Sequence, residues 1–146
     1  MAVVDASYKF IYVDVGGNGR ASDGGVFQSC TLRHALEQHL ASIPLSSNLR
    51  GTDVLMSYHL LGDDAFPLCD YIMKPFPFRN MTPQQRIFNY RLSRCRRTVE
   101  NAFGIMTSKF RVFLSSIQLQ PDKVDKLVLA ACVLHNYLRV KWTRII

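Results

Sequence analysis

The 146-residue sequence is poor in several features that identify common protein classes. Its longest uncharged apolar run, residues 127–134, is far shorter than the roughly 20 residues of a membrane-spanning helix. Asp5 interrupts the short apolar start, so we expect no signal peptide. The four cysteines include no C-x-x-C pair and fit no common zinc-binding template. We therefore expect reduced thiols in an intracellular protein.

Acidic side chains are also scarce in the second half of the chain. Residues 1–73 carry eight acidic and four basic side chains, net −4, whereas residues 74–146 carry three acidic and fourteen basic ones, net +11. A strongly basic stretch is typical of a surface that binds a polyanion. The length and the 48% apolar composition suit a single α/β domain over residues 1–146.

The first half of the chain alternates between short strand-like and loop-like segments. Residues 2–4 and 10–15 are rich in β-branched and aromatic side chains, which predicts two strands joined by a turn at 5–7. The apolar run 54–61 ends abruptly at Gly62, as is typical of a buried central strand. The other expectations are a glycine-rich loop over 16–25, a helix over 26–38, a loop over 43–53 and a short helix over 67–73.

Two longer helices are predicted in the second half, separated by a strand-like or irregular stretch over 112–119. Thr82, Pro83 and Gln85 form a capping box that predicts the start of the first helix. Gly104 is expected to weaken or kink this helix. Its buried face is predicted from apolar residues that recur every three or four positions, namely Phe88, Leu92, Cys95, Val99, Phe103, Met106 and Phe110. The last helix opens at Pro121, with Val124, Leu127, Val128, Ala131, Leu134 and Leu138 on one side.

Three residues within these helical patterns have both a structural and a chemical interpretation. Cys95 and Cys132 fall in apolar patterns, where cysteine usually serves as a small buried hydrophobe. His135 lies beside the apolar side of the last helix. For His135 we favour a packed, hydrogen-bonded core residue over a catalytic base.

Two acids stand out by their positions. Asp63 follows the predicted central strand, at the end where open α/β sheets place their ligands. Glu100 is the only acid between Lys74 and Gln120, and eight basic residues lie in the same span. Converging carboxylates are what a Mg²⁺ site needs, because this ion prefers oxygen ligands. On spacing alone, however, a surface ion pair of Glu100 with Arg96 and a helix-capping role for Asp63 are the more common explanations.

Five segments of the chain resemble, in the same order, a known family of nucleases. Residues 19–27 (GRASDGGVF) are similar to its G-x-x-[SH]-D-x-x-[VI]-[FL] segment, and residues 62–68 (GDDAFPL) to its G-D-x-[AG]-[YF]-P-L segment. Residues 96–104 (RRTVENAFG) resemble its R-x-x-V-E-x-x-F-G helix, followed by a similar 109–113 (KFRVF). Residues 131–138 (ACVLHNYL) match its C-V-L-H-N-[YF]-L helix. The family is that of the DDE-superfamily endonucleases of PIF/Harbinger transposases and Harbinger transposase-derived nucleases.

The resemblance implies an RNase H-like fold and a site that uses a divalent metal, Mg²⁺ or Mn²⁺. Carried over to this sequence, Asp63 is the second catalytic carboxylate and Glu100 the third, and both are metal ligands. Asp23 corresponds to a residue of the site loop rather than to a member of the triad. In the family the first catalytic aspartate lies on a strand upstream of the position of Ala2, so we expect the chain to be an N-terminally incomplete domain that lacks its first catalytic strand. With one carboxylate missing, the site should bind metal weakly, and we expect the chain to be inactive by itself.

The basic residues of the predicted helix are consistent with DNA, the substrate that the resemblance implies. Arginine binds phosphate oxygens through two parallel hydrogen bonds, so we expect these side chains to contact the DNA backbone rather than to read its sequence. The expected contacts are Arg91, Arg94, Arg96, Arg97, Lys109 and Arg111. The ordinary alternative is a solvated helix face.

Two functions from different classes follow. The first is a metal-dependent endonuclease domain that hydrolyses DNA phosphodiesters. The second is a catalytically dead, domesticated relative that binds DNA or a protein. The family implies DNA and a Myb-like DNA-binding protein as partners, no membrane, and location in the nucleus, with the cytoplasm as a second location.

Overall fold

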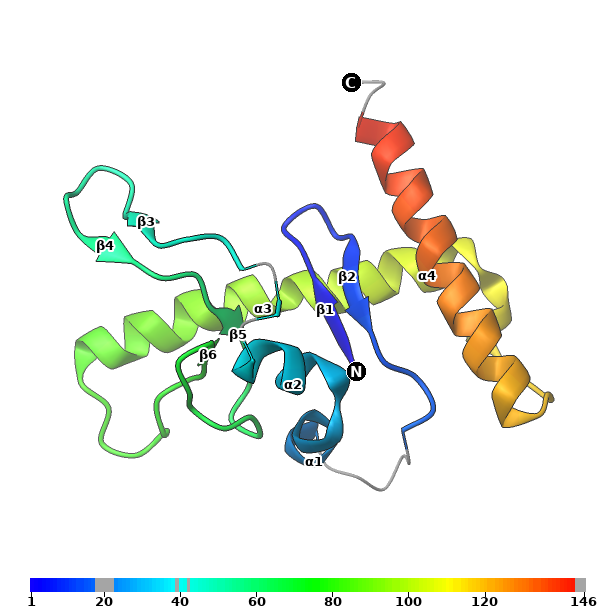
Figure 1. Cartoon of the computed structure of the whole chain (residues 1–146), viewed down its shortest axis with the longest axis horizontal. Coiled ribbons are helices and arrows are strands. Elements are labelled where there is room, and N and C mark those ends of the chain that lie inside the picture. Colours follow the sequence, from blue (N-terminus) through cyan, green and yellow to red (C-terminus); the bar gives the residue numbers. More distant parts are fainter. Residues whose placement is uncertain (18–22, 39, 42, 144–146) are drawn as a thin grey trace. The chain divides into compact units, whose positions relative to one another are not determined.

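The computed structural model describes residues 1–17, 23–38, 40–41 and 43–143 (Figure 1). The chain divides into two compact units, which are treated separately below. Unit 1 comprises Met1–Ala21 and Arg94–Ile146, and unit 2 comprises Ser22–Ser93. The long helix α3, Pro83–Lys109, belongs to both units, because it passes from one to the other between Ser93 and Arg94.

Unit 1 begins with the expected strand pair. Strands β1, Ala2–Val4, and β2, Phe10–Val13, are antiparallel. The turn between them is held by Asp5, whose carboxylate accepts hydrogen bonds from the backbone N–H groups of Ser7 (2.8 Å) and Lys9 (2.9 Å) and pairs with the Lys9 ammonium at 3.2 Å. Partial burial raises the pKa of the Asp5 carboxyl, but the contacts with Lys9 and Ser7 outweigh this effect and lower it overall.

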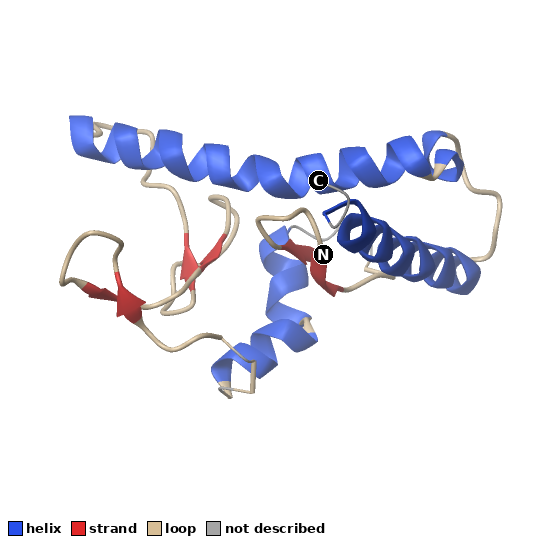
Figure 2. Cartoon of the chain, turned by 90° about the horizontal axis from the view of Figure 1, so that it is seen from above, coloured by secondary structure: helices blue, strands red, loops and turns tan. Residues whose placement is uncertain are grey.

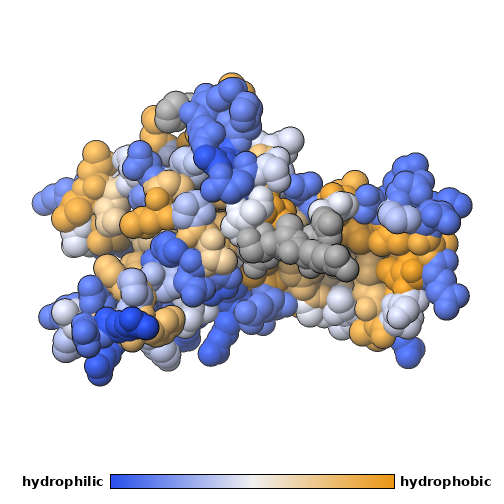
Figure 3. All heavy atoms as spheres, turned by 90° about the horizontal axis from the view of Figure 1, so that it is seen from below, coloured by the Kyte–Doolittle hydropathy of each residue, from blue (hydrophilic) through white to orange (hydrophobic). Residues whose placement is uncertain are grey.

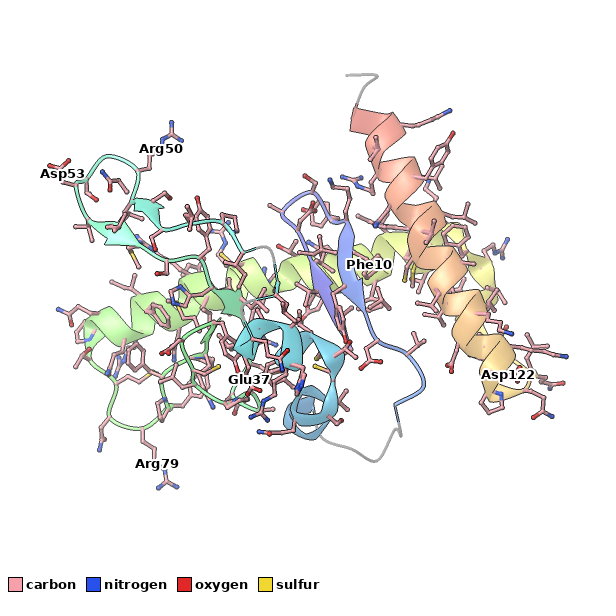
Figure 4. All side chains as sticks on the ribbon, in the orientation of Figure 1. Phe10, Glu37, Arg50, Asp53, Arg79 and Asp122 are labelled. Atoms are coloured by element: carbon pink, nitrogen blue, oxygen red, sulfur yellow. The ribbon has the colours of Figure 1, made fainter. Side chains whose placement is uncertain are left out.

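The core of unit 1 lies between this hairpin, the second half of α3 and the last helix, α4 (Pro121–Thr143). Its buried members are Phe10, Ala102, Met106, Ala131 and Cys132. Figure 4 labels Phe10, the member that β2 contributes. Cys132 is 4% exposed, which confirms its expected role as a small buried hydrophobe, and this burial raises the pKa of its thiol.

Helix α4 holds the hairpin through polar side chains as well. The carboxamide of Asn136 accepts a hydrogen bond from the Phe10 N–H at 2.8 Å and donates one to the Phe10 carbonyl at 2.7 Å. The Nε2 atom of His135, which is 2% exposed, lies 2.7 Å from the Tyr8 carbonyl, and Arg139 donates to the Ser7 carbonyl at 3.1 Å. We call Asn136 and His135 the backbone clamp. The expectation that His135 is a hydrogen-bonded core residue is confirmed.

Unit 2 begins with two short helices where one was expected over 26–38. Helix α1 covers Asp23–Ser29 and helix α2 covers Thr31–Glu37. The break falls at Cys30, whose backbone is extended and whose sulfur accepts a hydrogen bond from the Arg33 N–H at 3.4 Å. The buried Cys30 side chain therefore caps the start of α2, and the expected single helix is interrupted at this residue. Phe27 anchors the pair in the core of this unit, with its ring 5.6 Å from that of Phe66.

The apolar run 54–61 is not a buried central strand, which corrects the sequence-based expectation. It divides into β4, Leu55–Met56, and β5, Leu60–Leu61. Strand β4 is exposed and forms a hairpin with β3, Ser47–Asn48, inside the segment that was expected to be a loop. Arg50 and Asp53 mark the tip of this hairpin in Figure 4. The two halves of the apolar run therefore pair with two different strands, β3 and a later strand described below.

The expected helix over 67–73 is also wrong. Its end forms β6, Ile72–Met73, which pairs in parallel with β5. The Leu60 N–H donates to the Tyr71 carbonyl, and the Gly62 N–H donates to the Met73 carbonyl, each at 2.9 Å. These long-range hydrogen bonds outweigh a weak local preference for helix.

Helix α3 begins where the capping box predicts. The Thr82 hydroxyl accepts from the Gln85 N–H at 3.2 Å, and the Gln85 side chain accepts from the Thr82 N–H at 2.9 Å. Figure 2 shows a continuous helix, so Gly104 does not interrupt it. Within unit 2, Asn89 is buried on α3, and its carboxamide binds both the N–H and the carbonyl of Phe76 at 2.9 Å.

The predicted buried faces of both long helices are only partly correct. Leu92 and Met106 are buried on α3, but Cys95 and Phe103 are exposed. On α4 the buried side passes through Ala131 and His135, whereas Leu134 is 51% exposed. Further exposed apolar residues of α4 are Leu129, Val133, Tyr137 and Val140. Figure 3 shows apolar surface, in orange, on the face of the molecule seen from below.

The remaining connection, Arg111–Leu114, is a short 3₁₀ helix, followed by irregular chain up to α4. The described chain thus combines helices with three small sheets, as the α/β expectation requires. No helix within the described residues is long and apolar enough to cross a membrane.

The backbone clamp gives a test of what stabilises unit 1. Replacement of Asn136 by alanine leaves the N–H and the carbonyl of Phe10 without their partner, and we expect a loss of about 2–3 kcal/mol in the free energy of unfolding. The measurement is urea denaturation followed by circular dichroism. The matched control is Asn101→Ala, because Asn101 is exposed on α3. Equal midpoints for the two variants would show that the clamp contributes no stability.

Candidate active site

Asp63 lies two positions beyond the end of β5, a two-residue strand that takes the place of the expected central strand. It follows Gly62 and is half-buried. Its Oδ1 atom accepts a hydrogen bond from the Ala65 N–H at 3.0 Å, and its carbonyl accepts one from the Phe66 N–H at 3.3 Å. The carboxylate therefore holds a tight turn. It does not cap a following helix, because residues 67–73 do not form one.

The start of α1 packs against this turn. A Cβ atom added at Gly24 would lie 2.4 Å from the Ala65 carbonyl oxygen, which is closer than real side chains approach. Glycine at this position therefore allows α1 to contact the chain that carries Asp63. Asp23 is the first residue of α1, one position before Gly24. Its side chain lies outside the described atoms, so its expected role in the site loop stays a prediction.

Glu100 lies on the exposed side of α3, in unit 1. Among the described residues no ion pair joins Glu100 to Arg96, the surface pair that its spacing allows. Glu100 borders a cleft of about 470 Å³ between the hairpin turn and α3. The other lining residues are Tyr8, Asn101, Gly104, Ile105 and Ser108.

A larger cavity, of about 710 Å³, lies beside α1 and α2 in unit 2. Its lining residues lie between Gln28 and Leu40, and none of them is a site residue predicted from the sequence. Asp63 and Glu100 belong to unit 2 and unit 1, respectively. Within the described residues there is no group of three or more His, Cys, Asp or Glu side chains arranged to hold a metal ion.

The basic side chains assigned to DNA are carried mainly by α3. Arg91, Arg94, Arg97 and Lys109 are exposed, and Arg96 is half-buried. Arg111 is exposed at the start of the 3₁₀ helix that follows. The exposed members of this set can reach a polyanion in solution.

Two comparisons identify the class of protein. Residues 1–136 match the model of the DDE superfamily endonuclease family, and the chain belongs to that family. It is 23% identical over 143 residues to Protein ALP1-like of Arabidopsis thaliana, a match that covers 94% of this chain and 34% of that protein. It is 35% identical over 80 residues to the protein named Putative nuclease HARBI1 of Homo sapiens, and of Bos taurus, covering 53% of this chain and 23% of the relative.

These matches confirm the family resemblance, including its connection with Harbinger transposase-derived nucleases. The chain spans about a third of the length of the ALP1-like protein and about a quarter of that of HARBI1. No solved structure matches the chain.

Sequence reasoning missed Tyr8 and Asn136. Tyr8 has a φ of 63°, a left-handed conformation that bulky residues rarely adopt, and it lines the cleft beside Glu100. Asn136 was named only as part of the C-V-L-H-N segment, and no structural role was predicted for it. Its place beside His135 in that segment was the one available signal for the clamp that fixes the hairpin turn.

The contact between Gly24 and Ala65 can be tested directly. In Gly24→Ala the new methyl group collides with a backbone oxygen, so we expect a loss of about 1–3 kcal/mol in stability and a displaced turn at Asp63. The measurements are the denaturation midpoint and the NMR shift of the Ala65 amide, which reports its bond to Asp63. Gly17→Ala is the control, since a Cβ at Gly17 meets nothing within 4 Å. An unmoved Ala65 resonance in Gly24→Ala would contradict the close packing.

Proposed function

We propose that the chain is the nuclease domain of a transposase-derived, metal-dependent enzyme that hydrolyses DNA phosphodiesters. The observation that carries the proposal is the family match over residues 1–136. Asp63 and Glu100, which we propose as two of the catalytic acids from the motif resemblance, lie within this span. The location of Asp63 beyond the end of β5 supports this, because strand ends are where α/β sheets place ligands.

The state of Glu100 gives independent support. It is the only acid of a strongly basic segment, yet among the described residues no ion pair joins it to Arg96, and it borders a cleft. A carboxylate kept for structure in such surroundings is usually paired with a neighbouring arginine. An exposed carboxylate beside a cleft is instead able to bind a cation and a substrate.

The proposed metal is Mg²⁺ or Mn²⁺, with Asp63 and Glu100 as ligands. Oxygen ligands suit these hard ions, which keep open positions for water and phosphate. A bound metal would stabilise the charge that develops on the phosphodiester oxygens during hydrolysis. Asp23 is proposed to orient the loop that carries the site, which agrees with the contact of its neighbour Gly24 with the turn that follows Asp63. The RNase H-like arrangement, as one domain over residues 1–146, belongs to this proposal.

The proposed contacts to the DNA backbone are the basic residues already named on α3 and after it. Their exposure supports the assignment, and neutralised phosphates would make the affinity fall with salt. The partners proposed with this activity are DNA and, as in the family, a Myb-like DNA-binding protein. We propose the nucleus as the place of action.

The decisive experiment is plasmid nicking with Mg²⁺ or Mn²⁺. It is run on the 146-residue chain and on a chimera in which the corresponding upstream segment of an ALP1-like relative precedes Met1. The family resemblance implies that the first catalytic acid lies on that segment. We expect the chimera to nick, and Asp63→Asn or Glu100→Gln to reduce the rate roughly hundredfold or more, because each removes a metal ligand.

The controls separate chemistry from binding and folding. Asp64→Asn changes an exposed acid adjacent to Asp63 and should retain full nicking. Both site variants should bind duplex DNA with the affinity of the unsubstituted chain. Unchanged nicking in Asp63→Asn and Glu100→Gln would disprove the site assignment.

A further inference from the structure

The cleft beside Glu100 is formed entirely within unit 1. Tyr8 comes from the turn of the β1–β2 hairpin, and the other five lining residues lie on successive turns of α3. Its volume of about 470 Å³ is within the range of pockets that bind small molecules or parts of larger ligands.

The lining indicates what kind of group would fit. None of the described residues that line the cleft is basic, and the Glu100 carboxylate repels an unaccompanied anion, so a phosphate alone is a poor occupant. The Tyr8 ring and Ile105 offer apolar contact. The Asn101 carboxamide can donate and accept, and the Ser108 hydroxyl, which donates to the Ile105 carbonyl at 2.8 Å, still has lone pairs that can accept. A neutral ring with hydrogen-bonding edges satisfies these conditions.

Gly104 opens the cleft on the side of α3. Glycine inside a helix is less stable than alanine, so the position needs a reason. Packing within the protein gives none, because a Cβ atom at Gly104 meets nothing within 4 Å. A methyl group at this position would occupy part of the cleft, whereas glycine keeps that space open for a ligand.

Tyr8 borders the cleft from the hairpin in a strained conformation. Its φ of 63° is unfavourable for a bulky side chain, and such strain persists only where the surroundings enforce it. Three contacts do so here: the Tyr8 N–H donates to the Asp5 carbonyl at 3.0 Å, His135 lies 2.7 Å from the Tyr8 carbonyl, and the Arg139 guanidinium lies 5.3 Å from the ring centroid. The ring is therefore fixed before any ligand arrives.

We propose that this cleft is a nucleoside subsite, which takes the base and deoxyribose of one unstacked nucleotide next to the phosphate that is cleaved. The choice of DNA as the ligand rests on the proposed function. Stacking on the Tyr8 ring and insertion beside Gly104 would hold the nucleoside, while Asn101 and Ser108 bind its polar edges. Because the base must leave the duplex stack to enter, single-stranded or distorted DNA is the preferred ligand.

The test measures binding without metal, so that it does not depend on cleavage. Fluorescence anisotropy follows single-stranded oligonucleotides in EDTA, at an ionic strength that weakens contacts to the backbone. A 2-aminopurine base placed at successive positions reports stacking in the cleft. We expect Gly104→Ala to lower the affinity roughly tenfold and to remove the 2-aminopurine signal, while its denaturation midpoint rises. A purely structural role for Gly104 would not lower affinity while stability increases.

Two further variants complete the design. Tyr8→Asn removes the ring but tolerates the left-handed backbone, and we expect weaker binding, whereas Tyr8→Phe keeps the ring and the affinity. Ser93→Ala also raises the helix propensity of α3, but Ser93 does not line the cleft, so the affinity of this variant should match that of the unsubstituted chain.

Unchanged affinity and 2-aminopurine signal in Gly104→Ala and Tyr8→Asn would overturn the subsite, whatever the nicking assay gives. Altered binding without any nicking by the chimera would instead support the subsite and overturn the proposed hydrolysis.

Discussion

The fold of unit 1 depends on a single half-buried carboxamide, that of Asn136. A hairpin as short as β1–β2 is not stable alone, and Asn136 ties it to α4 by binding both backbone groups of Phe10. With His135 bound to the next turn residue, Tyr8, the hairpin cannot shift along the helix without losing three hydrogen bonds. The position of Phe10 in the core and the shape of the cleft beside Glu100 both follow from this attachment.

Unit 2 uses the same solution independently. Asn89 on α3 binds the N–H and the carbonyl of Phe76, and the Phe76 ring packs at 5.2 Å from Phe88 one residue earlier on the same helix. In both units an asparagine side chain on a helix binds the backbone N–H and carbonyl of one residue, as a neighbouring strand would, and so holds irregular or weakly paired chain. The polar groups of such chain must be satisfied when they are buried, and among the described residues no buried side-chain polar atom lacks a hydrogen bond.

The features that could be predicted from the sequence are those set by neighbours along the chain. The capping box at Thr82 and Gln85 is local, so the start of α3 was correct. The run 54–61 was misread because its two halves find partners at Ser47 and Ile72, and no local pattern carries that information. For the site, motif order leads only to the proposal of Asp63 and Glu100. The strained turn at Tyr8 could not be predicted, because it depends on a contact with His135, more than 120 positions away.

The distribution of unfavourable features supports a functional cleft in unit 1. Two positions of this unit oppose stability: Tyr8 with its left-handed backbone, and Gly104 inside a helix. Asn80, the other described non-glycine residue with positive φ, is of a type that tolerates this conformation. Since Tyr8 and Gly104 line the same cleft as Glu100, the departures from stability coincide with the residue that we propose as catalytic. Local rules are commonly broken where a ligand binds, and packing alone would not place both exceptions beside one carboxylate.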